Sequence, residues 1–106
     1  MQKNEGKNMA TKNNGFLKRA DEHISLANEQ LEQEITQGEV SASFMYGAAR
    51  FNAWIASTSF ANAQDMANEK DKIIEYFVNE YKLALAEHID NHVSNYDFSQ
   101  NNIEEE

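Results

Sequence analysis

The side chains of this sequence best suited to specific chemistry are its histidines. His88 and His92 are four residues apart, so on a helix they share a face and both imidazoles could bind one metal ion. Two imidazoles are too few for a site, and a third ligand would have to be His23 or a carboxylate such as Glu22. Both histidines fall in an apolar helical arc, which favours a hydrogen-bonded role in a core or interface. His88 and His92 are therefore candidate metal ligands, and no cofactor is expected.

A second candidate site lies in the stretch SASFMYGAARFNAWIAS, residues 41–57. Arg50 and Asn52 flank Phe51, and Trp54 follows one helical turn after Arg50. Asn52 falls between two apolar faces, where a buried amide needs hydrogen-bond partners and can fix the register of a packed helix. We take Arg50, Asn52 and Trp54 as candidate interface or binding residues, with structural hydrogen bonding as the simpler role for Asn52.

The composition argues against several classes of function. The chain of 106 residues has no cysteine, which excludes thiolate catalysis and cysteine zinc sites and fits a reducing cytoplasm. No serine has a recognisable base and orienting group, so we expect no enzymatic activity. A formal net charge of −9 repels phosphate backbones, so nucleic acid is not an expected partner. No apolar run approaches the roughly 20 residues of a membrane span, and we expect a cytoplasmic protein without membrane contact.

Apolar periodicity predicts an all-α chain of three helices, because proline is absent and glycine is scarce. The first helix begins at Phe16, presents one apolar stripe and ends at Gly38, the expected left-handed cap. The second begins after Ser41 as N-cap, with Val40 packed on Met45 as a hydrophobic staple.

The second helix carries two apolar faces, so it must be covered on two sides. One face holds Val40, Phe44, Phe51, Trp54 and Ile55, and the other holds Met45, Ala49, Ala53, Ala56 and Phe60. Gly47 costs about 1 kcal/mol relative to alanine in a helix interior, so we interpret it as the mark of a close helix crossing.

The third helix is predicted to begin at an Asn62 cap paired with Asp65 and to run to Tyr96, which makes it the longest element. An alternative is a break near residues 82–83 that folds the second half back as a fourth helix. The domain prediction is a disordered basic arm over residues 1–15, a single helical domain over 16–98 and an acidic tail over 99–106.

Three segments, ADEHISLANEQ, SASFMYGAARFNAW and IIEYFVNEYKLALAEHIDNHVSNYD, resemble a family of short uncharacterised bacterial helical proteins, a domain of unknown function. The resemblance covers roughly residues 16–97. It implies a small helical protein with no assigned activity, and it supplies no catalytic residues.

These observations predict an interaction or assembly protein that pairs into a dimeric helical bundle. The C-terminal half of the third helix presents Leu85 and Ile89 together with His88 and His92, a stripe that three helices of one chain would leave in water. The predicted partner is a second copy, and an unidentified protein is the other candidate. The alternative function is a metal- or small-ligand-binding bundle that uses the two histidines.

Overall fold

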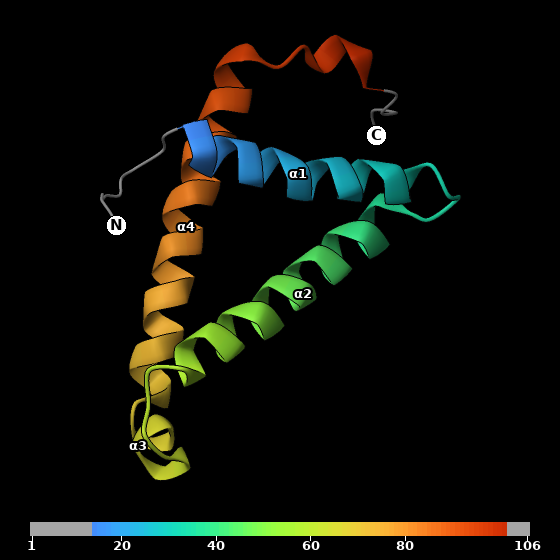
Figure 1. The fold of residues 1–106 in the computed structure, drawn as a ribbon. Coiled ribbons are helices and arrows are strands. Elements are labelled where there is room, and N and C mark those ends of the chain that lie inside the picture. The colour runs from blue at the N-terminus through green and yellow to red at the C-terminus, as the bar shows by residue number, and fades with distance from the viewer. Residues whose placement is uncertain (1–13, 102–106) are drawn as a thin grey trace, which may run out of the picture. The chain divides into compact units, whose positions relative to one another are not determined.

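The structure is a computed structural model that describes residues 14–101 (Figure 1). These residues form helices and no strand, which confirms the predicted all-α class. The elements are α1 (Asn14–Leu31), α2 (Gln37–Ser57), α3 (Ala63–Asn68), α4 (Lys70–Asn95) and the short 3-10 helix η2 (Phe98–Gln100). No helix of this part of the chain is both long and apolar enough to cross a membrane.

The chain divides into two units between Ile55 and Ala56, and each is described by itself. The first contains α1 and all but the end of α2, and the second contains α3, α4 and η2. The single domain over residues 16–98 stays a prediction. The predictions of a disordered arm and an acidic tail fall mostly on residues 1–13 and 102–106, which lie outside the described residues.

In the first unit, α1 ends at Leu31, earlier than the sequence pattern predicted. The N–H of Gln33 donates to the carbonyl of Gln30 at 3.1 Å, so the chain leaves the helix through a tighter 3-10 turn. Glu34 then takes the left-handed conformation, with φ of 62°. The prediction that Gly38 caps the first helix is wrong, because Gly38 already lies in the first turn of α2.

A reciprocal capping box starts α2. The N–H of Glu39 donates to Oγ1 of Thr36 at 3.1 Å, and the N–H of Thr36 donates to Oε1 of Glu39 at 3.0 Å. Two amides that have no partner within the helix are thereby satisfied. The prediction that Ser41 is the N-cap is wrong, because Thr36 supplies the cap five residues earlier.

The position of Val40 follows from this earlier start. With Thr36 as N-cap, Val40 is the fourth helical residue and Ile35 the residue before the cap, which are the two positions of a hydrophobic staple. The predicted staple between Val40 and Met45 is therefore wrong. Val40 is 4% exposed and is the only buried hydrophobic residue of the described chain.

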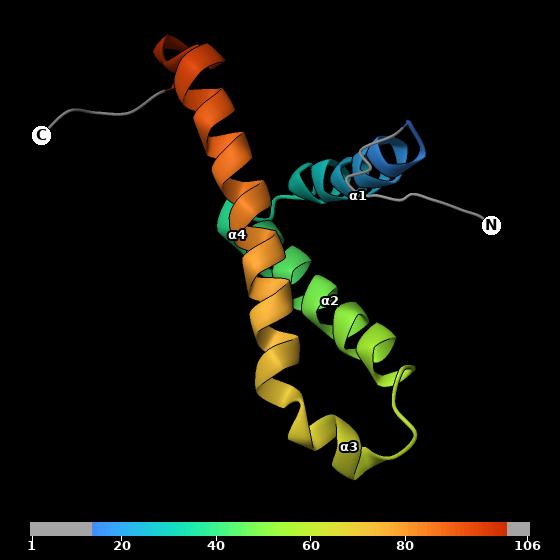
Figure 2. The same ribbon diagram turned by 90° about the vertical axis from the view of Figure 1, so that its left-hand side faces the viewer.

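In the second unit, the predicted cap at Asn62 is confirmed. Its Oδ1 accepts the N–H of Asp65 at 2.9 Å and begins α3. The predicted long C-terminal helix is confirmed as α4, the longest element, but its predicted start at Asn62 is wrong, because Glu69, with φ of −102° and ψ of 8°, departs from helical geometry and separates α3 from α4. α4 then runs unbroken to Asn95 (Figure 2), which excludes the alternative break near residues 82–83.

Both units leave large apolar side chains exposed. In the first unit these include Phe16, Leu17, Ile24, Leu26, Phe44, Met45, Phe51, Trp54 and Ile55. In the second they include Ile74, Tyr76, Val78, Tyr81, Leu83, Leu85, Ile89, Val93, Tyr96 and Phe98. Single exposed apolar side chains are ordinary on protein surfaces, whereas these sets recur along successive helical turns and so form an apolar face on a helix.

Candidate functional site

The main concave feature of the first unit is a groove between α1 and α2, with a volume of about 830 Å³. Its apolar lining consists of Leu26, Ala27, Phe44, Gly47, Ala48 and Phe51. A Cβ built on Gly47 would meet no atom within 4 Å, so the space over this glycine is open. The close helix crossing predicted at Gly47 is not formed within the first unit.

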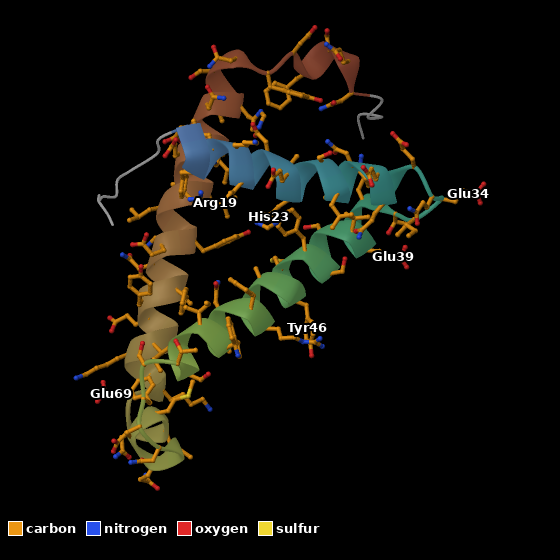
Figure 3. The ribbon with its side chains drawn as sticks, viewed as in Figure 1. Arg19, His23, Glu34, Glu39, Tyr46 and Glu69 are labelled. Atoms are coloured by element: carbon orange, nitrogen blue, oxygen red, sulfur yellow. The ribbon has the colours of Figure 1, made fainter. Side chains whose placement is uncertain are left out.

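The polar side chains of the groove lie mainly on its α1 wall. Arg19 and His23, one turn apart, are on the side of α1 that faces α2 (Figure 3). Asn52, a predicted interface residue, lines the groove from α2 and is half-buried. No carboxylate is among the lining residues, so the Arg19 guanidinium gives this wall a positive charge.

Arg50 is not among the residues that line this groove. Its guanidinium carbon lies 5.3 Å from the ring centroid of Tyr46, within the range of a cation–π contact. Figure 3 shows Tyr46 on the side of α2 away from α1. At an exposed position such a contact contributes about 0.5–1 kcal/mol, which is a sufficient structural role for Arg50.

Trp54 lies beside the groove residue Phe51. Their ring centroids are 6.0 Å apart with the planes tilted by 42°. Both residues are 60% exposed. The pair therefore forms an aromatic surface on α2, whereas the sequence pattern placed both rings in a covered face.

The second unit holds the two candidate metal ligands. His88 and His92 are exposed on α4, and the His92 ring packs edge-on against Tyr96 with centroids 5.7 Å apart. Among residues 14–101 no three His, Asp or Glu side chains gather closely enough to hold a metal ion. Metal binding by His88 and His92 stays a prediction, as does the interface role of Leu85 and Ile89, which are 43% and 51% exposed on the same helix.

A smaller concavity of about 480 Å³ lies in the second unit. Its aromatic side chains are Phe60, Tyr76 and Phe77, and the last two meet edge-on with centroids 5.0 Å apart. Lys72 Nζ and Glu69 Oε1 are 3.8 Å apart at its edge, a solvent-exposed ion pair worth less than about 1 kcal/mol. Its polar lining consists of Ser59, Glu69, Lys72 and Tyr76.

The turn after α4 has an ordered carboxylate. Asp97 accepts hydrogen bonds from the Ser99 hydroxyl, the Gln100 side chain and the Ser99 N–H, and these bonds lower the pKa of Asp97 below its usual 3.8. The carboxylate is exposed and caps η2. Its perturbed pKa has a structural origin, and a catalytic role for it has no support.

Two comparisons with known proteins give a match. The family model DUF3144, described as "Protein of unknown function", matches residues 16–93. The NMR structure of the protein NB7890A from Shewanella sp. is 42% identical, covers 83% of this chain and 93% of its own, and has a TM-score of 0.72. No curated protein matches. Since the family model covers most of the chain, the resemblance noted in the sequence is confirmed: this chain belongs to the DUF3144 family of proteins of unknown function.

Proposed function

We propose that this protein is a small helical assembly protein that acts by associating with a second copy of itself and has no catalytic activity. The observation that carries the proposal is the exposure of large apolar side chains at helical spacing in both units. The absence of catalysis rests on the sequence, which offers no nucleophile with a recognisable base.

The energetics of folding support association. Fixing one residue costs about 1–2 kcal/mol of backbone entropy, and burying one large apolar side chain returns only about 1.5–3 kcal/mol. Val40 is the only hydrophobic residue buried in the described chain, so folding needs additional apolar burial. A second copy is the source that we propose for this burial.

The surface that best fits self-association is on α4. Tyr81, Leu85 and His88 recur at three- and four-residue spacing, so they lie on one face, and Ile89 lies at its border. A two-fold dimer covers such a face by using the same patch on both copies.

The mass in solution tests the proposal. Light scattering at micromolar concentration is expected to give about twice the chain mass of 12.1 kDa. Ile89→Asp should reduce the mass toward that of one chain, because it places a charge in the apolar contact. The matched control is Asp90→Ala, a change of the neighbouring residue on the polar side of α4. A native mass of one chain over the whole micromolar range would overturn the proposed function.

A further inference from the structure

We propose that the break between α3 and α4 is a conformational joint: Phe60 holds it bent, and release of Phe60 lets residues 63–95 form one continuous helix. All of the residues involved lie in the second unit, and none of them needs a second copy. α3 turns away from the axis of α4 at Glu69 (Figure 2). The continuous form would lengthen α4 from 26 residues to 33, because α3 adds six and Glu69 adds one.

The sequence on both sides of the break is able to form a single helix. Residues 63–72 contain neither glycine nor proline, the two residue types that oppose a helix interior most strongly. On a continuous helix Met66, Ile73 and Phe77 would follow one another at spacings of seven and four residues, so they would share one face. From Ala63 to Asn95 the backbone leaves helical geometry only at Glu69. The break therefore needs a cause other than helix propensity.

Phe60 is placed to supply this cause. It lies in the turn after α2, where its N–H donates to the carbonyl of Ser57 at 3.3 Å. Its ring lines the concavity of the second unit together with Ile73 and Phe77 of α4. The half-buried residues of the range 56–101 are Ala56, Phe60, Met66, Glu69, Ile73 and Phe77. The least exposed side chains of the second unit thus gather around the break, and Phe60 ties them to the end of α2.

The hydrogen bonds at the break show what the bent form gives up. The N–H of Glu69 donates to the carbonyl of Met66 at 3.0 Å, a 3-10 bond, and the N–H of Ile73 donates to the carbonyl of Glu69 at 3.0 Å as α-helical bonding resumes. Within the described chain, no hydrogen bond joins the N–H groups of residues 70–72 to a carbonyl of α3. A continuous helix would satisfy these amides. Three exposed backbone bonds and the burial of one aromatic ring are similar in free energy, so removal of the ring should reverse the preference.

Spin-label distances test the joint directly, because the native chain has no cysteine to compete for the label. Labels at Ala63→Cys, at the start of α3, and Lys82→Cys, on α4, report whether the two helices are collinear. A continuous helix separates these positions by about 28 Å, and the bent form brings them closer together. Labelled chain is diluted with unlabelled chain, so that only distances within one copy are measured. We expect the shorter distance without further change and about 28 Å when Phe60→Ala is added.

Two control variants separate release of the joint from other effects. Phe98→Ala removes an aromatic ring beyond the other end of α4 and should leave the shorter distance unchanged. Asp71→Pro favours the bent form, because proline is tolerated in the first turn of a helix but not in its interior. Added to Phe60→Ala, it should restore the shorter distance.

Amide hydrogen exchange gives a second measurement that needs no label. In Phe60→Ala the exchange of residues 70–72 should slow at least about tenfold, because their N–H groups gain helical partners. A shorter distance that persists in Phe60→Ala would show that another contact holds the break. Loss of the helical circular dichroism signal in that variant would show that Phe60 is needed for α4 itself, and about 28 Å in the chain that retains Phe60 would show that the joint is not bent. Each of these three results would overturn the proposed joint.

Discussion

Replacement of Thr36 by alanine tests the start of α2. Its Oγ1 accepts the N–H of Glu39 at 3.1 Å and its hydroxyl donates to the Glu39 carboxylate at 3.1 Å, and alanine removes both bonds. Loss of an N-cap typically costs about 1 kcal/mol, so we expect Thr36→Ala to lower the free energy of unfolding by about that amount. For a domain of this size such a loss lowers Tm by about 4–8 °C.

Urea denaturation followed by circular dichroism measures this loss. Every variant is compared at one protein concentration, because association makes apparent stability depend on concentration. Thr36→Ser should retain the cap. The matched control is Ser41→Ala, which lies inside α2 and should be neutral or stabilising by up to about 0.5 kcal/mol. If Ser41→Ala is as destabilising as Thr36→Ala, α2 begins after Ser41 and the capping box is wrong.

Three further predictions concern local features. Glu34→Gly should raise the free energy of unfolding by about 0.5 kcal/mol in the same urea assay, because glycine takes the observed positive φ without a Cβ clash, and a loss of stability would contradict the left-handed turn. The hydrogen bond from Ser99 lowers the pKa of Asp97, so its contribution to the turn is present above the usual pKa of 3.8 and is lost as pH falls through the lowered value. An NMR titration of the Ser99 amide with a midpoint above 3.8 would refute this. Elemental analysis of untagged protein should find only substoichiometric zinc, iron, nickel and copper, and one metal per chain would instead support His88 and His92 as ligands.

The helical class of this chain and one of its caps were predictable from the sequence. Apolar residues recur every three to four positions, a spacing that only a helix places on one face. Asn62 is a residue type that favours the N-cap position, and the acidic Asp65 three residues later strengthens the prediction that a helix starts there. The structure agrees at that position because both signals are local to one turn.

The sequence carries the signal for the observed start of α2, but a second pattern at the same place competes with it. Thr36 and Glu39 have the spacing of a capping box, but Gly38 between them matched the expectation for the end of a helix. The reciprocal hydrogen bonds decide between these two patterns, since they satisfy the first amides of α2. The turn needed before α2 is made by Glu34, a residue type that rarely signals a left-handed conformation.

Two other features of the structure, the helix break at Glu69 and the groove between α1 and α2, cannot be recognised from residue types alone. The break at Glu69 has neither glycine nor proline beside it, so helix propensity alone does not locate it. The groove depends on the angle between α1 and α2, which apolar spacing does not determine. For the same reason the sequence pattern places Phe51 and Trp54 on a covered face, whereas both are exposed: periodicity shows which side of a helix is apolar, but not what packs against it.

The exposed aromatic pair Phe51 and Trp54 has a consequence for the lifetime of a single copy. Cellular chaperones and proteases act on chains that display apolar residues, and the proposed partner would shield this chain from them. Because the fraction of paired copies rises with concentration, the rate of degradation should fall as synthesis increases. A pulse-chase experiment at low and high expression measures this, and equal half-lives would contradict it. The abundance of the protein would then depend on a threshold rate of synthesis. Below the threshold most copies would be unpaired and degraded, and above it most copies would be paired and retained.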